Sequence, residues 1–177
     1  KISFTGSTNT GKAILRNAAE SFKRVTLELG GKSPTILLDD VDLAQAIPLV
    51  IQAGFMNSGQ ACVAGTRILV PYSRKAEIET ALAQAVAAVK SGDPRNSATD
   101  VGPMVSEKQW LRVQGYIRKG IEEGARLLAG GEGRPDGTRD GWFVRPTLFA
   151  DVNNRMTIAR DEIFGPVLCV IPYQDEA

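Results

Sequence analysis

The order of apolar and polar residues divides the chain into alternating strands and helices. Val25, Leu27 and Leu29 alternate with polar residues, which is the period of a strand. Apolar runs predict further strands at residues 1–4, 35–38, 67–71, 125–129, 142–148 and 167–173. Apolar residues spaced by three or four predict helices at 12–22, after the N-capping Asp42, at 73–89 and at 106–124.

Glycine and proline separate these segments. The stretches 5–11, 91–103 and 130–141 are rich in turn-forming residues and predict loops, the last of them a solvated surface loop. Pro48 lies inside the helix after Asp42 and should kink it or mark its first turn. Strands that alternate with helices predict an α/β fold with a largely parallel sheet and flanking helices.

Composition excludes several classes of protein. The 177 residues are 43% hydrophobic and 23% charged, as in globular domains. A net charge of +1 gives no field that would capture nucleic acid, and no apolar run is long enough to cross a membrane. Cys62 and Cys169 form no disulfide framework, which favours a reducing, cytoplasmic location. The chain opens at Lys1, inside an apparent strand, so we expect a piece of a longer polypeptide.

The chain contains no histidine. Catalysis by Ser/His/Asp or Cys/His groups of this chain is therefore excluded. A zinc or non-haem iron site is also not expected, because two scattered cysteines cannot supply its ligands.

The segment Gly6–Lys12 between a strand and a helix has three interpretations. It fits most of the phosphate-binding pattern G-x-x-x-x-G-K-[ST], and Asp39 would then help to hold magnesium, but Ala13 replaces the metal-binding hydroxyl. Alternatively, Gly6, Ser7 and Gly11 form a dinucleotide-binding turn whose N–H groups meet a pyrophosphate. The third interpretation is a simple helix cap.

Cys62 is the candidate nucleophile. Glycines flank it in Gly59–Gly65, which indicates an accessible position, whereas Cys169 lies in an unbroken apolar strand and should be a core residue. A free thiol has a pKa of about 8.5, so it needs an activating group. Without histidine, the candidate base is Glu28, which lies between Leu27 and Leu29. Such a carboxylate is either an exposed strand residue or a group in an apolar pocket, where burial would raise its pKa.

Several stretches together resemble the NAD(P)-dependent aldehyde dehydrogenase family over the whole chain. They are Phe4-Thr5-Gly6-Ser7-Thr8 with Gly11, Leu27-Glu28-Leu29-Gly30-Gly31-Lys32-Ser33-Pro34, Asn57-Ser58-Gly59-Gln60-Ala61-Cys62, Gly92-Asp93-Pro94, Val101-Gly102-Pro103, Pro146-Thr147-Leu148 and Glu162-Ile163-Phe164-Gly165-Pro166-Val167. Any one of them could be chance, but their number and order are specific.

The resemblance implies a role for each candidate residue. Cys62 would attack the carbon of a small-molecule aldehyde, and Glu28 would activate the water that releases the acid. Gly6, Ser7 and Gly11 would lie at the pyrophosphate of NAD or NADP, and the Leu29 carbonyl at the nicotinamide amide. For the nicotinamide ribose and ring, the resemblance implies Glu162 and Phe164, with Gln109 as a further ribose ligand. Lys12 would then be an ordinary helix residue.

The same resemblance implies how the chain is divided. Residues 1–29 would end a dinucleotide-binding domain, and residues 30–177 would be most of an aldehyde dehydrogenase-like catalytic domain. The family's catalytic asparagine and the segment that completes its homo-oligomers lie outside the sequence, so we expect the 177 residues alone to be inactive. The presence of Glu28 favours relatives that hydrolyse the thioester over those that pass the acyl group to coenzyme A. A non-catalytic relative with an unused thiol remains the other alternative.

Overall fold

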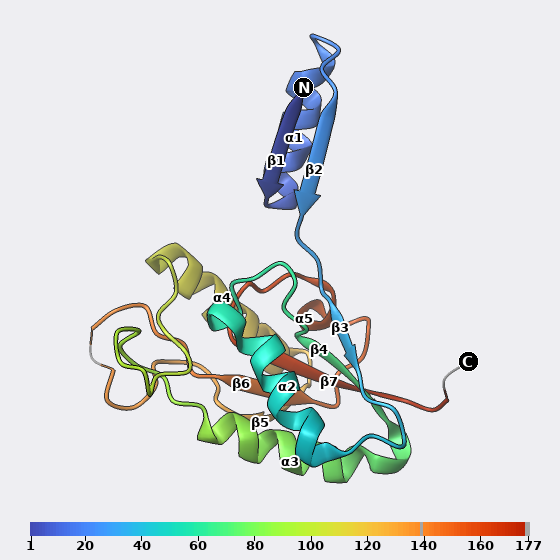
Figure 1. Ribbon diagram of the computed structural model, residues 1–177, viewed down its shortest axis with the longest axis vertical. Coiled ribbons are helices and arrows are strands. Elements are labelled where there is room, and N and C mark those ends of the chain that lie inside the picture. Colours follow the sequence, from blue (N-terminus) through green and yellow to red (C-terminus); the bar gives the residue numbers. More distant parts are fainter. Residues whose placement is uncertain (139, 176–177) are drawn as a thin grey trace. The chain divides into compact units, whose positions relative to one another are not determined.

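The computed structural model of the protein describes residues 1–138 and 140–175. Its contacts divide the chain into two compact units, Lys1–Gly31 and Lys32–Ala177. In Figure 1 the first unit is blue, and the second runs from light blue to red. Each unit is described by itself. Within the described ranges, no helix combines the length and the apolar character that crossing a bilayer requires.

The first unit is a strand–helix–strand unit. It contains β1 (Ile2–Gly6), α1 (Thr8–Ala19) and β2 (Val25–Leu29). The two strands are parallel, with Gly6 opposite Leu29, so both end at the same edge. The strand at Val25–Leu29 is therefore confirmed.

Helix α1 differs from the prediction at both ends. It begins at Thr8, not Lys12, because the Ser7 side chain accepts a hydrogen bond from the Thr10 N–H and caps the helix. It ends at Ala19, and Phe22 then adopts a left-handed φ of 50° and is exposed rather than part of the apolar face. Ser, Thr and Asn at residues 7–10 have the composition of a loop, but here they form a cap and a first turn.

The second unit is built on a five-stranded sheet in the order β3-β4-β7-β6-β5. The strands are β3 (Pro34–Ile36), β4 (Arg67–Pro71), β5 (Arg126–Ala129), β6 (Thr147–Ala150) and β7 (Val167–Tyr173). All neighbouring strands are parallel except β5, which runs antiparallel to β6. The predicted α/β fold with a largely parallel sheet is confirmed.

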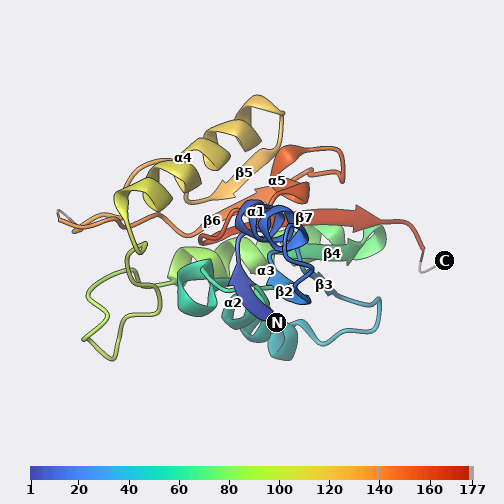
Figure 2. The same ribbon diagram turned by 90° about the horizontal axis from the view of Figure 1, so that it is seen from above.

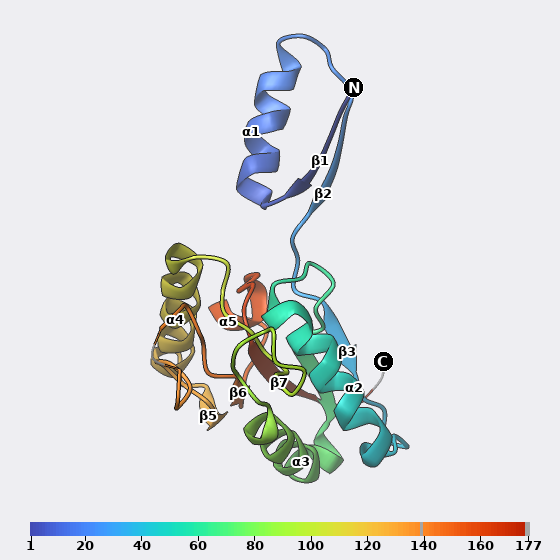
Figure 3. The same cartoon turned by 60° about the vertical axis from the view of Figure 1, so that its left-hand side comes forward.

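Helices cover both faces of this sheet. Figures 2 and 3 show α2 (Leu43–Phe55) and α3 (Lys75–Ala88) on one face, and α4 (Glu107–Glu122) and α5 (Thr157–Arg160) on the other. Two short 3₁₀ turns, η1 (Met56–Gly59) and η2 (Tyr72–Arg74), follow α2 and precede α3. Asp42 caps α2 as predicted, and the helix continues through Pro48.

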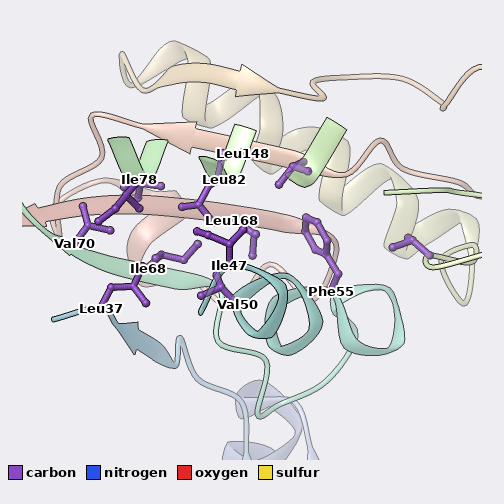
Figure 4. Packing of buried hydrophobic residues seen from close by; sticks show 13 residues of the cluster. Leu37, Ile47, Val50, Phe55, Ile68, Val70, Ile78, Leu82, Leu148 and Leu168 are labelled. Carbon is purple, nitrogen blue, oxygen red and sulfur yellow. The ribbon is translucent and has the colours of Figure 1, made fainter. Parts of the chain in front are cut away.

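Two apolar layers hold these helices on the sheet. Strand β7 is buried on both faces, and its residues alternate between the layers. Leu168 and Val170 pack with residues of α2 and α3, a layer shown in Figure 4. Val167, Cys169 and Ile171 pack with residues of α4 and α5. Cys169 is fully buried, which confirms its prediction as a core residue.

Two strand predictions were inaccurate. The segment 142–148 is a strand only from Thr147, because Trp142 packs against Trp110 and its carbonyl accepts from the Met104 N–H in a loop. Strand β3 covers Pro34–Ile36 instead of residues 35–38. Helix α5 was not predicted, since four residues are too few for an apolar period to be recognised.

Candidate active site

The Cys62 thiol lies on a tight turn that precedes β4 of the five-stranded sheet in the sequence. The Ala64 N–H donates to the Ala61 carbonyl at 3.1 Å, which closes the turn around Cys62, and β4 begins at Arg67. The Cys62 side chain is exposed, as its glycine-rich surroundings predicted. Its backbone N–H has no hydrogen-bond acceptor within the described ranges. The turn therefore presents a thiol together with a free N–H group.

Three consecutive left-handed residues set the path into this turn. Asn57, Ser58 and Gly59 have φ values of 48°, 60° and 72°. Only glycine adopts this conformation without strain, and at Gly59 an added Cβ would lie 2.2 Å from the Gly165 carbonyl oxygen. The backbone before Cys62 is therefore in contact with the segment that carries Glu162 and Phe164.

Side chains fix the same segment to a second loop. The Ser58 hydroxyl donates to the Gly102 carbonyl at 3.1 Å, and the Gln60 amide oxygen accepts from the Val105 N–H at 2.9 Å. Asn57 and Gln60 also donate to each other's backbone carbonyls. Stretches around residues 60, 102 and 165 are thus brought together by contacts that hold the cysteine turn.

Glu162 and Phe164 lie on an irregular turn between α5 and β7, and both are half-buried. Phe164 has a φ of 60°, which is strained for a residue with a Cβ. The Gln109 amide donates to the carbonyls of Ile163 and Phe164 at 3.1 and 2.7 Å. Gln109 was predicted as a ribose ligand, but its amide N–H groups are used to hold this turn.

The start of α1 lies at the edge of the first unit where β1 and β2 end. Gly6 passes directly into the Ser7 cap, and α1 has no acidic residue in its first turn. Free N–H groups at a helix start favour a phosphate. An added Cβ at Gly6 would lie 2.6 Å from the Phe4 ring, so the position suits glycine. Gly11 is buried inside α1, where a Cβ would lie 2.7 Å from Leu29, and its N–H donates to the Ser7 carbonyl.

Glu28 lies on the exposed face of β2. The half-buried Leu27 and Leu29 side chains approach Gly11 of α1, and Glu28 projects from the opposite face of the strand. Residues 1–31 therefore do not enclose it. Of the two alternatives that the sequence left open for Glu28, this unit shows the exposed strand residue and not the apolar pocket. Sequence alternation could assign Glu28 to a face of the strand but could not reveal what covers that face.

The interpretation as a nucleotide-hydrolase loop is wrong. Such a site needs an open loop between its two glycines, but Ser7 alone separates β1 from α1. Lys12 lies one turn inside the helix. Asp39 accepts a hydrogen bond from the Ser73 hydroxyl at 3.0 Å, and its carbonyl accepts from Arg74, both within the second unit.

Some residues of the site were not found by sequence reasoning. The Lys32 ammonium is buried without a hydrogen-bond acceptor within the described ranges, and burial lowers its pKa. On α4, Arg112 and Tyr116 contact the turn that carries Glu162. The spacing of Gln109, Arg112 and Tyr116 places them on one helix face, but such a face resembles any solvated one.

Comparison with known proteins shows that this chain is similar to members of one family. It matches the sequence profile described as "Aldehyde dehydrogenase family" over residues 1–177. A protein of Staphylococcus haemolyticus, provisionally named an aldehyde dehydrogenase, is 54% identical over an alignment of 178 positions, which covers 99% of this chain and 38% of that protein.

Solved structures of aldehyde dehydrogenases are also similar to this chain. An aldehyde dehydrogenase of Mycobacterium tuberculosis in complex with NAD⁺ is 57% identical, with a TM-score of 0.96 over 99% of this chain and 36% of that one. A mutant aldehyde dehydrogenase C of Pseudomonas syringae, in complex with NAD⁺ and octanal, is 49% identical, with a TM-score of 0.95 over 98% and 36%. The chain thus spans little more than a third of the length of these relatives.

Proposed function

This chain belongs to the aldehyde dehydrogenase family, and on that premise we propose that the protein containing it oxidises an aldehyde to a carboxylic acid with NAD or NADP. The observation that carries the proposal is the Cys62 thiol, which is exposed on a turn that close contacts hold in place. An accessible thiol and a carboxylate can carry acyl chemistry without a histidine.

The residues present fit a dinucleotide. The start of α1, with Gly6 and the Ser7 cap, supplies donors for a pyrophosphate. Glu162 would accept hydrogen bonds from the nicotinamide ribose, and Phe164 would contact the ring. The Leu29 carbonyl, at the end of β2, would accept from the nicotinamide amide. When bound, the cofactor supplies the acceptor for the hydride that leaves the substrate carbon.

The remaining chemistry belongs to the residues of the chain. The Cys62 thiolate attacks the aldehyde carbon to form a thiohemiacetal, and its oxidation leaves a thioester on the same sulfur. The free N–H of Cys62 donates to the developing oxyanion. Glu28 takes a proton from the water that hydrolyses the thioester, which restores the thiol and releases the acid.

Location and assembly belong to the same proposal. Both cysteines of the chain are free thiols, and a catalytic thiol is preserved in a reducing compartment, so we assign the protein to the cytoplasm. We expect the complete protein to be a homo-oligomer that acts on a small-molecule aldehyde, with neither nucleic acid nor membrane as a partner.

Replacement of Glu28 by glutamine in the complete protein tests this proposal. Without its base, Glu28→Gln should still give one turnover of NADH but stop at the thioester, so steady-state turnover falls by roughly 10²–10⁴-fold. Mass spectrometry should then find the acyl group on the Cys62 peptide. Glu20→Gln, at an exposed position after α1, is the matched control and should retain activity. Wild-type turnover by Glu28→Gln would refute the assigned role.

A further inference from the structure

One face of α4 binds the whole turn between α5 and β7. Gln109, Arg112 and Tyr116 lie on that face at spacings of three and four residues. Gln109 donates to the carbonyls of Ile163 and Phe164. An Arg112 Nη donates to the Glu162 carbonyl at 2.7 Å, and the Tyr116 hydroxyl donates to the Asp161 carboxylate at 3.0 Å. Every residue from Asp161 to Phe164 is thus hydrogen-bonded to α4.

The turn has a conformation that needs such support. It lies outside any helix or strand, and Phe164 has a left-handed φ of 60°. A non-glycine residue keeps this conformation only where its surroundings impose it. Gly165 packs so closely on α4 that an added Cβ would lie 2.5 Å from the Val113 side chain. The helix therefore imposes the position of the turn through both packing and hydrogen bonds.

Tyr116 and Arg112 act as a pair. The Arg112 guanidinium lies 5.1 Å from the centre of the Tyr116 ring, and one Nη also donates to the Tyr116 hydroxyl at 3.2 Å. The hydroxyl therefore accepts from Arg112 while it donates to Asp161. Burial, and then the hydrogen bond to Asp161, raise the pKa of Tyr116, so the phenol remains a donor at neutral pH.

We propose that Tyr116 and Arg112 are positioning residues that hold the Asp161–Phe164 turn in the conformation that binds the nicotinamide riboside half of the cofactor. The inference rests on the proposed function, which assigns that half to Glu162 and Phe164. Neither Tyr116 nor Arg112 needs to touch the cofactor. Their contribution is to order Glu162 and Phe164 before binding, so that less entropy is lost when the ligand arrives.

Binding of two ligands to the complete protein tests the inference. ADP contains the adenosine and pyrophosphate of NAD⁺ but lacks the nicotinamide riboside. Tyr116→Phe removes one oxygen atom, and with it the bonds to Asp161 and Arg112. By calorimetry, the Kd for NAD⁺ should rise about fivefold, as expected when the one hydrogen bond from Tyr116 to the turn, that to Asp161, is lost, while the Kd for ADP stays within about twofold. In steady-state assays, kcat should change less than the KM for NAD⁺.

Matched variants separate positioning from general destabilisation. Tyr72→Phe, at an exposed tyrosine of η2, should leave both Kd values unchanged. Arg112→Met should weaken NAD⁺ binding as Tyr116→Phe does. Arg112→Lys keeps a donor for the Glu162 carbonyl and should therefore retain part of the affinity for NAD⁺. If Arg112→Met does not fold, Tyr116→Phe decides alone.

The results that would contradict the positioning role differ from those that would contradict the proposed function. An unchanged Kd for NAD⁺ in Tyr116→Phe, or an equal weakening of NAD⁺ and ADP, would overturn the positioning role while leaving the proposed function intact. Failure of the wild-type protein to bind either NAD⁺ or NADP⁺ would overturn both.

Discussion

The surroundings of some residues could be predicted from the neighbouring sequence, and those of others could not. The contrast between Cys62 and Cys169 was predictable, because one lies among glycines and the other in an unbroken apolar strand. The left-handed turn before Cys62 was not, since Asn57 tolerates that conformation without being confined to it, and Ser58 adopts it only when contacts impose it. Those contacts involve residues more than forty positions away.

Alkylation of the folded protein measures this difference between the cysteines. Iodoacetamide should modify Cys62 at least about 100-fold faster than Cys169, because thiolate character and access control the rate. Cys169 is fully buried, burial raises the pKa of its thiol, and its Sγ donates to the Ile158 carbonyl. In denaturant the two rates should converge. Equal labelling of both cysteines before unfolding would contradict the contrast between an accessible Cys62 and a buried Cys169.

At the scale of elements, the sequence predicted strands and long helices better than their boundaries. Strands Val25–Leu29, Arg67–Pro71 and Val167–Tyr173 match their apolar runs. The start of α1 was misplaced because a capping serine and a loop serine look alike in sequence. The cluster that joins α3 to β5 and to the residue after β6 was not predicted. In it, Asp151 pairs with Lys75 and Arg126, and Arg126 also pairs with Glu79.

Replacement of Asp151 by asparagine tests this cluster. Lys75 and then Arg126 lower the pKa of the Asp151 carboxyl. A carboxyl with a lowered pKa contributes stability above its unfolded value, near 3.8, and loses that contribution as pH falls through the folded value. Asn also tolerates the left-handed φ of 56° at this position, so the substitution removes the charge of the side chain without straining the backbone.

Asp151→Asn should lower the free energy of unfolding at pH 7 by about 1 kcal/mol, a value already reduced for solvent screening of a partly exposed pair. The difference from wild type should shrink as the pH falls below 3.8 and disappear once the pH lies below the folded pKa of the Asp151 carboxyl. Thermal unfolding at pH 7 and along an acid series, with the exposed Asp40→Asn as control, is the measurement. A difference that persists in acid would exclude the ion pairs as its cause.

At the scale of the whole molecule, the α/β fold followed from the alternation of strands and helices, but the chemistry did not follow from the fold. The glycine segment Gly6–Lys12 alone left a nucleotide hydrolase open, and only the direct passage from β1 through Ser7 into α1 closed that alternative. The boundary between compact units falls after Gly31, within the stretch that follows Glu28. The roles of Cys62 and Glu28 therefore need to be tested in the complete protein.

The most direct test is aldehyde-dependent reduction of NAD⁺ by the complete protein with each cysteine replaced in turn. Cys62→Ala should lower kcat by at least about 10³-fold, because the other cysteine of the chain, Cys169, is fully buried. Cys169→Ala, which removes only a buried sulfur from the core, should retain kcat within a few-fold once the rates are scaled to folded protein. Turnover by Cys62→Ala at the wild-type rate would contradict the account.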